Sequence, residues 1–189
     1  MNESAFAIIL QEIQRNEKEQ MLIALDGRCA SGKTTLASRL KEAVNCNVIH
    51  MDHFFLQPEQ RTESRLSQPG GNVDYERFLQ EVADPLRLGR AFSYRVFDCK
   101  TMGFSEDIRV EPKPVTIVEG AYCCHPSLWD FYDLHLFLNI DPQEQLRRIA
   151  CRNGEQALAA FRERWIPLEE QYFNACQIRE RCDYVFTQC

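Results

Sequence analysis

The hydrophobic positions of this chain form two kinds of run that alternate along the sequence. Short continuous runs are typical of buried parallel strands, and runs with a spacing of three or four residues are typical of helices. The continuous runs predict strands at 21–25, 47–51, 94–97, 115–118, 134–140 and 184–187. The spaced runs predict helices at 5–14, around 36–44, at 75–83, from 142 to about 153, and at 155–175 with an interruption at Pro167.

Strands that alternate with crossover helices predict an α/β fold, with a parallel sheet covered by helices on both faces. The polar segment 57–73 is rich in proline and glycine and is expected to be a loop, and Pro85 is expected to stop the helix before it. Ligands of such sheets bind at the carboxyl ends of the strands. Asp26, Asp52 and Glu119 each follow a predicted strand. We therefore expect these three carboxylates at one edge of the sheet.

The segment GRCASGKTT, residues 27–35, lies between a predicted strand and a predicted helix. It fits the phosphate-loop pattern G-x-x-x-x-G-K-[ST], in which backbone N–H groups and the positive end of the helix surround phosphate oxygens. Lys33 is expected to contact the β- and γ-phosphates of ATP, and Thr34 to offer its hydroxyl to Mg²⁺. The expected nucleotide-binding residues are Gly27, Arg28, Cys29, Ala30, Ser31, Gly32, Lys33, Thr34 and Thr35.

Composition narrows the classes of partner. The 189 residues carry a net charge of −6, which argues against nucleic acid and membrane surfaces as partners. We find no apolar run long enough for a membrane helix and no basic leader, so we expect a cytoplasmic protein in which the nine cysteines are reduced. The length favours one domain over 1–189. The sequence leaves open whether the chain forms a homo-oligomer.

Asp52 is the candidate for the base that acts on the attacking hydroxyl. It follows a predicted strand and precedes two phenylalanines, Phe54 and Phe55, in the segment MDHFF. A carboxylate there can take a proton from an attacking hydroxyl, while the aromatic rings exclude water. Asp26, next to the loop, is the alternative base. The sequence has no NKxD guanine signature, and the strand before Glu119 ends in IVEG rather than in the aspartate usual in ATPases.

These segments resemble a known family. GRCASGKTT, MDHFF, NVDYERF, IVEG and LRRIACR occur in the order seen in the uridine kinase and phosphoribulokinase group of P-loop small-molecule kinases, over about residues 20–188. The resemblance implies a P-loop kinase fold with a helical lid, here at about 147–165. It also implies ATP-dependent transfer of the γ-phosphate to a hydroxyl of a small nucleoside-, sugar- or vitamin-like metabolite.

The resemblance also assigns roles to residues. It implies that Asp52 is the catalytic base, that Glu119 helps hold Mg²⁺ and that Asp74 binds substrate hydroxyls. It implies that Arg148 and Arg152, which share one helix face, contact the nucleotide phosphates from the lid. Phe97 lies in the segment where the family places a base-recognising tyrosine and is therefore expected to contact the substrate, and Met102 lies at about the place of a histidine. We therefore do not expect uridine to be the substrate.

Several simpler interpretations remain open at this stage. Asp74 is also a natural N-cap for the helix after it, and Glu144 is placed both to complete a capping box with Asp141 and to pair with Arg148. Metal sites at His50–Asp52–His53, or at Cys123, Cys124 and His125, are weaker alternatives. The alternative functions are a nucleotide-binding ATPase or switch protein that acts on a protein partner, and a nucleoside monophosphate kinase.

Overall fold

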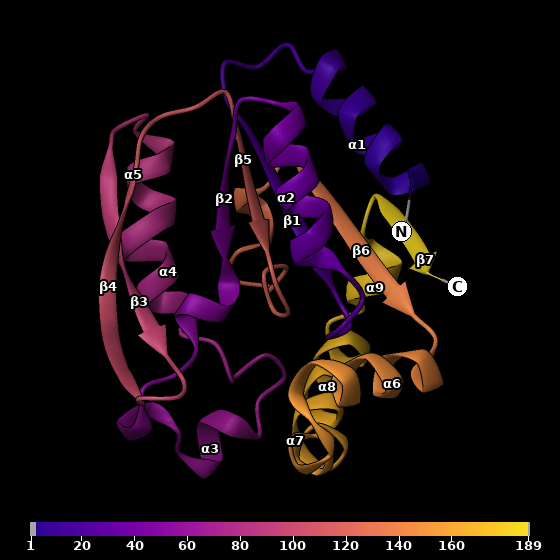
Figure 1. Ribbon diagram of the computed structural model, residues 1–189. Helices are drawn as coiled ribbons and strands as arrows, with labels where there is room; N and C mark the ends of the chain where they lie inside the picture. Colours follow the sequence, from indigo (N-terminus) through magenta and orange to yellow (C-terminus); the bar gives the residue numbers. More distant parts are fainter. Residues whose placement is uncertain (1–2, 189) are drawn as a thin grey trace.

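The computed structural model describes residues 3–188, and within them the strands form one five-stranded and one two-stranded sheet. The larger sheet is parallel throughout, with the order β2-β5-β1-β6-β7 (Figure 1). Its strands are β1 Met21–Gly27, β2 Cys46–His50, β5 Val115–Glu119, β6 Leu134–Ile140 and β7 Tyr184–Gln188. The smaller sheet is an antiparallel hairpin of β3 Phe92–Asp98 and β4 Gly103–Val110. The predicted α/β fold with a helix-flanked parallel sheet is confirmed.

The helices lie on both faces and at the carboxyl end of the large sheet. The longer ones are α1 Glu3–Arg15, α2 Lys33–Ala43, α6 Pro142–Asn153, α7 Glu155–Ala160 and α8 Ile166–Ala175. The short helical segments are η1 Met51–Phe54, η2 Pro58–Gln60, α3 Glu63–Leu66, α4 Tyr75–Phe78, η3 Leu79–Ala83, α5 Asp84–Arg87, η4 Trp129–Phe131, η5 Phe161–Trp165 and α9 Ile178–Arg181. None of the helices within 3–188 is both long and apolar enough to cross a membrane.

Two hydrophobic cores form because successive side chains of a strand point to opposite faces of the sheet. On β1, Ile23 and Leu25 join the core that α1 and α2 cover, whereas Ala24 joins the core on the other face. On β6, Leu136 and Phe137 divide in the same way. The second core also takes up residues of α4, the hairpin and α8. The continuous apolar runs in the sequence therefore reflect strands that are buried on both faces.

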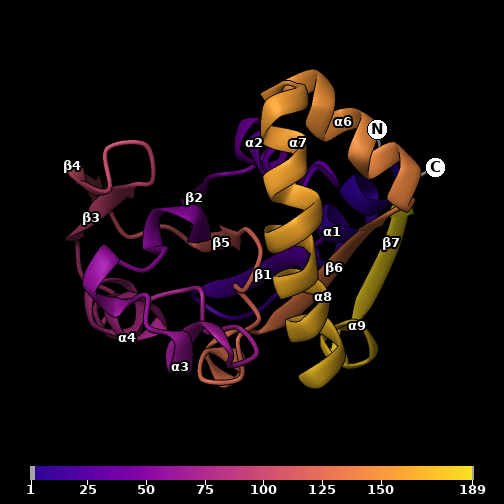
Figure 2. The ribbon, with the colours of Figure 1, turned by 90° about the horizontal axis from the view of Figure 1, so that it is seen from below.

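The register of the sheet brings the ends of its inner strands to one level. Glu119, the last residue of β5, pairs with His50 at the end of β2 and with Leu25 of β1. In Figure 1 these carboxyl ends point to the lower half of the view, where α3 lies on one side and α6 and α7 on the other. Figure 2, seen from that end, shows the continuous helix from α7 through η5 to α8 crossing this edge of the sheet.

Two predictions about prolines were wrong for the same reason. The helix that begins at Tyr75 continues past Pro85 to Arg87, and the helix from Glu155 to Ala175 is not interrupted at Pro167. A π turn precedes each proline, at η3 and at η5. Each proline then lies in the first turn of the α-helix that follows, where its missing N–H is tolerated.

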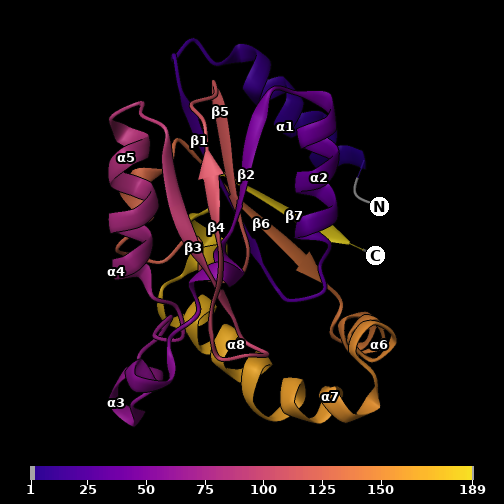
Figure 3. The ribbon, with the colours of Figure 1, turned by 60° about the vertical axis from the view of Figure 1, so that its left-hand side comes forward.

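The prediction was also incomplete between residues 57 and 110. The segment 57–73 contains η2 and α3 in place of a plain loop, and the strand at 94–97 is one half of the hairpin, whose second strand β4 was not predicted. The reason is that β4 is mostly exposed and polar, so it has no apolar run. Figures 1 and 3 both show this hairpin beside α4 and α5, on the β2 side of the large sheet.

Candidate active site

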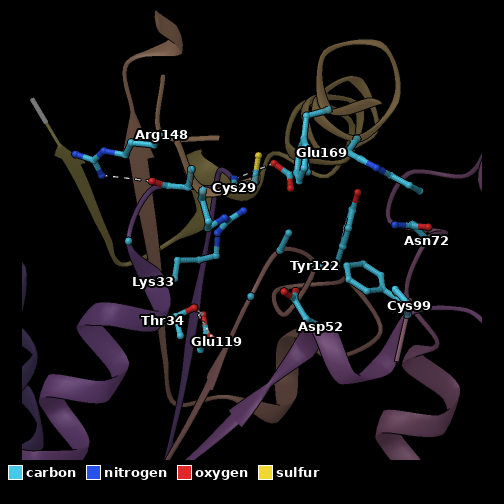
Figure 4. A pocket seen from close by; sticks show the side chains of 18 of the residues that line it. Cys29, Lys33, Thr34, Asp52, Asn72, Cys99, Glu119, Tyr122, Arg148 and Glu169 are labelled. Carbon is cyan, nitrogen blue, oxygen red and sulfur yellow. Dashed lines mark hydrogen bonds between the residues drawn. The ribbon is translucent and has the colours of Figure 1, made fainter. Parts of the chain in front are cut away.

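A cavity of about 790 Å³ opens at the carboxyl ends of β1, β2 and β5 (Figure 4). Its walls come from the phosphate loop, the turn after β5, the loop region 52–102 and the segment from α6 to α8. Its lining includes ten of the predicted residues: Cys29, Ala30, Gly32, Lys33, Thr34, Thr35, Asp52, Glu119, Arg148 and Arg152. A cavity of this size is large enough for a nucleotide phosphate chain with a second small molecule.

The phosphate loop is held in shape by backbone geometry. Gly27 has φ +135°, and a Cβ there would lie 2.1 Å from the carbonyl oxygen of Leu138, so only glycine fits. The Lys33 ammonium donates to the carbonyl oxygens of Gly27 at 2.7 Å and of Arg28 at 2.9 Å. These bonds hold the lysine across its own loop, where it lines the cavity. Gly27, Arg28 and Ser31 belong to the loop but do not line the cavity.

Thr34, Glu119 and His50 form a chain of polar contacts below the loop. The Thr34 hydroxyl donates to the Glu119 carboxylate at 3.0 Å, and His50 Nδ1 lies 2.5 Å from Glu119 Oε1. The hydrogen bond with Glu119 raises the pKa of His50 above its ordinary value. A hydroxyl and a carboxylate are the hard oxygen ligands that Mg²⁺ prefers. The residues predicted to support magnesium are therefore adjacent and fit that ion chemically.

Asp52 lies in η1, directly after β2, and lines the cavity. Its side chain is exposed and lies among the side chains that line this cavity (Figure 4). Desolvation raises the pKa of Asp52, and the nearby negative charge of Glu119 adds to that effect. Gly120 makes room for this arrangement, because a Cβ there would lie 2.9 Å from Met51 Cβ and 3.4 Å from Asp52 Oδ1.

Arg148 and Arg152 both line the cavity from α6, as their i, i+4 spacing predicted. Arg148 donates to Glu144 at 2.7 Å and to the Ala30 carbonyl of the phosphate loop at 3.3 Å. Asp141 caps α6 as predicted, but the capping box with Glu144 does not form. The Glu144 carboxylate instead binds Arg148 and the neighbouring arginine of the helix, because a charged pair with guanidinium offers stronger hydrogen bonds than a backbone N–H.

Asp74 and Phe97 are absent from the cavity lining, and their expected contacts with the substrate stay predictions. Asp74 is buried and caps α4, accepting from the Arg77 N–H at 3.0 Å, while its other oxygen accepts from Gln60 Nε2 at 2.9 Å. The capping interpretation of Asp74 is therefore confirmed. Phe97 is buried and its ring contacts Phe104 of the hairpin. Both side chains are occupied by partners that the sequence pattern did not reveal.

Other cavity residues were missed by the sequence reasoning. Asn72, Tyr122, Arg61 and Glu169 all line the cavity, from four separate segments of the chain. Tyr122 has φ +73°, an uncommon conformation for a residue with a side chain, and such strain is typical of functional sites. The sequence carried no signal for these residues, because they come from loops and from a helix far along the chain.

Asp26, the alternative base, is fully buried and does not line the cavity. Its carboxylate accepts hydrogen bonds from the N–H groups of Gly27 and Cys124 and from the Tyr172 hydroxyl. Within residues 3–188, the ligand atoms of Asp26, Cys123 and Cys124 are close enough to surround a metal ion. His125 is not part of that group, and its ring stacks on Tyr75 at 4.2 Å. Asp26 therefore has a structural role under the loop.

Comparisons with known proteins agree with this geometry. No protein-family model matches the chain. The chain is 24% identical over 155 residues to a uridine kinase of Ureaplasma parvum, covering 77% of this chain and 75% of that protein. It is 26% identical over 147 residues to uridine kinase-like protein 4 of Arabidopsis thaliana, covering 73% of this chain but 30% of that protein. This chain therefore spans a minor part of the Arabidopsis protein.

Solved structures extend the comparison to nearly the whole chain. A protein of Bacillus stearothermophilus described as a possible uridine kinase superposes with a TM-score of 0.73 at 18% identity, over 97% of both chains. A D-glycerate 3-kinase of Cryptococcus neoformans gives a TM-score of 0.70 at 15% identity, over 97% of this chain and 93% of that one. At such identities the likeness shows the fold. The predicted resemblance to uridine kinase-like P-loop kinases is confirmed.

Proposed function

We propose that the protein is a phosphotransferase that moves the γ-phosphate of ATP to a hydroxyl of a small metabolite. The observation that carries this proposal is the single cavity that Lys33, Thr34, Asp52 and Glu119 all line. A phosphate-binding loop by itself is common to many nucleotide-binding proteins. A carboxylate that faces the same cavity from the next strand is what an alcohol acceptor requires.

In this proposal each side chain has a role that follows from its place. Lys33 and the loop N–H groups bind the phosphates, and Thr34 and Glu119 would hold Mg²⁺, which would neutralise charge on the nucleotide. Asp52 orients the acceptor hydroxyl and accepts its proton. Its raised pKa suits this role, because a more basic carboxylate accepts a proton more readily. Arg148 and Arg152 stabilise negative charge that shifts during transfer.

The helical segment over the cavity serves as the lid, at about residues 147–165 of a single kinase domain. Phe161 and Trp165 of this segment line the cavity, so its cover includes apolar rings beside the two arginines. Such rings exclude water, which would otherwise compete with the alcohol for the phosphate. The acceptor is a nucleoside-, sugar- or vitamin-like alcohol. Phe97 is buried and absent from the cavity lining, but the guanidinium of Arg61, which does line the cavity, lies over its ring, so a contribution of Phe97 to substrate recognition stays a prediction.

The test is a metabolite panel with purified protein, ATP and Mg²⁺. We expect slow ATP turnover by the protein alone, and acceleration by one compound of a panel of nucleosides, sugars and vitamin-like alcohols, with its phosphate ester detected by mass spectrometry. Parallel reactions with GTP define the nucleotide preference. ATP hydrolysis that no alcohol accelerates, but that a protein partner stimulates, would overturn the proposal in favour of the ATPase or switch alternative.

A further inference from the structure

Two residues of helix α8 that follow Glu169, Glu170 and Tyr172, bind residues at the start of the phosphate loop. The Glu170 carboxylate pairs with the Arg28 guanidinium, at 2.6 Å to Nε and 3.0 Å to Nη2. The Tyr172 hydroxyl donates to Asp26, the residue before the loop, at 2.8 Å. Two anchors of this kind keep α8 close to the loop. The helix therefore cannot withdraw without breaking a bidentate ion pair and a buried hydrogen bond.

One residue before these anchors, Glu169 accepts a hydrogen bond from a backbone N–H of the phosphate loop. Its Oε2 accepts from the Cys29 N–H at 3.0 Å, and both residues line the cavity (Figure 4). Glu169 is only 6% exposed. Backbone N–H groups of such a loop are the donors that cradle phosphate oxygens. The carboxylate oxygen of Glu169 therefore occupies a donor that a phosphate oxygen of a bound nucleotide would otherwise use.

We propose that Glu169 is a built-in competitor for the phosphate loop, and that it takes up a proton when a nucleotide phosphate arrives beside Cys29. This inference rests on the proposed function only in that a nucleotide binds at the loop. A charged carboxylate and a phosphate repel each other strongly in a partly desolvated site. Because α8 is anchored, Glu169 cannot relieve this repulsion by moving with its helix. Protonation removes its charge and converts one oxygen into a donor for the phosphate.

The charges around Glu169 allow this protonation near neutral pH. Burial raises the pKa of Glu169 to about 7, which the Lys33 ammonium opposes and the Asp26 carboxylate reinforces. Arg28, Cys29 and Tyr122 also interact with the Glu169 charge from the loop and from the turn after β5. A phosphate adds negative charge to this group. The pKa of Glu169 therefore rises further on binding, so that nucleotide binding and proton uptake are linked.

The experiment measures binding of a magnesium complex of a non-hydrolysable ATP analogue by titration calorimetry from pH 6 to 8.5. Titrations in two buffers with different ionisation enthalpies give the number of protons taken up. For the wild-type protein we expect affinity to fall by up to about tenfold per pH unit above pH 7, with an uptake that approaches about one proton at pH 8. Glu169→Gln should bind more tightly at pH 8 and take up no proton.

Glu163→Gln is the matched control, because it removes an exposed carboxylate of the same continuous helix, outside the cavity lining, while Glu169 and both anchors stay in place. It should keep the pH slope and the proton uptake of the wild type, whatever its affinity. Equal slopes and equal uptake in the wild type and in Glu169→Gln would overturn the inference and leave the proposed function standing. Absence of binding by all three proteins would overturn both. Wild-type titrations without proton uptake at pH 8 would overturn the inference even if a variant did not fold.

Discussion

The two sides of the cavity are built in different ways. On the phosphate side, residues 26–35 with Glu119, the polar groups are held by backbone atoms or by immediate neighbours, as Lys33 is by the carbonyl oxygens of its own loop. On the acceptor side, residues 52–110, packed aromatic side chains hold the structure: the centroid of the Phe54 ring lies 5.1 Å from that of Phe78, in an edge-to-face contact, and 5.3 Å from that of Tyr94. The phosphate side therefore depends on backbone geometry, and the acceptor side on side-chain packing.

Two pairs of buried or half-buried groups near the cavity respond to pH in opposite directions, although Asp52 on the acceptor side has a raised pKa like the first pair. Burial raises the pKa of Asp26 and Glu169 on or next to the phosphate side, so the folded state holds their protons more tightly than the unfolded state. Their contribution to stability is lost as pH rises. Burial lowers the pKa of His53 and His125, which pack with the acceptor side, to about 4. Their contribution is lost as pH falls below their ordinary value.

The substitution with the largest expected effect is Gly27→Ala, which disrupts the backbone conformation of the phosphate side. Gly27→Ala places a Cβ 2.1 Å from the Leu138 carbonyl oxygen, at a φ that side chains rarely adopt. We expect a loss of about 4 kcal/mol or more in the free energy of unfolding, measured by urea denaturation. The control is Gly103→Ala on the acceptor side, where a Cβ meets nothing within 4 Å. It should change stability by less than about 0.5 kcal/mol.

Asp52→Asn tests whether a carboxylate of the acceptor side supplies the base for transfer of the phosphate that is bound on the phosphate side. We expect it to keep nucleotide binding but to slow phosphoryl transfer on the order of 10²-fold or more, because the amide cannot accept the proton of the alcohol. Steady-state kinetics with the acceptor from the panel, combined with calorimetric binding of the ATP analogue, separate these effects. Asp107→Asn, at an exposed position of β4 outside the cavity, is the control. A near-normal rate in Asp52→Asn would assign proton transfer to another group.

His125→Gln tests whether a buried histidine makes the free energy of unfolding fall at acidic pH. The pKa of His125 is about 4 when folded, against an ordinary 6.5, so the unfolded state takes the proton first as pH falls. Wild-type stability should therefore include a loss of up to about 1.4 kcal/mol per pH unit between pH 6.5 and 4, from this residue. Urea denaturation at several pH values should show a shallower decline in the variant. An unchanged decline would mean that His125 is protonated in the folded state as well.

The smallest expected effect concerns Asp74. Because its carboxylate caps α4 and does not line the cavity, Asp74→Ala should lower the free energy of unfolding by about 1 kcal/mol. The Michaelis constant for the acceptor should change little. Urea denaturation and steady-state kinetics on the same preparation give both quantities. A large increase in that constant with unchanged stability would restore Asp74 to the substrate site.

Secondary structure and the phosphate loop were predicted correctly wherever a local sequence pattern is compatible with only one structure. The strands of the large sheet and helices α1, α2 and α6 came from the spacing of apolar residues, and the phosphate loop from its glycines. Asp52 and Glu119 were placed at the same edge because parallel strands end there. This approach did not predict the hairpin strand β4, because an exposed strand has no apolar run. It also did not predict that two helices continue past a proline, because a π turn has no simple sequence pattern.

For the site, the sequence by itself determined the anion-binding half, because the loop, its helix and the ends of adjoining strands are set by neighbours in the chain. Only the tertiary structure decided the other half. It gave Asp74 a capping role and Phe97 a ring contact with the hairpin, and it brought Glu169, Tyr122 and Asn72 to the cavity. The physical reason is that a polar side chain points toward whichever partner satisfies it, and for these residues that partner or surface comes from distant parts of the chain.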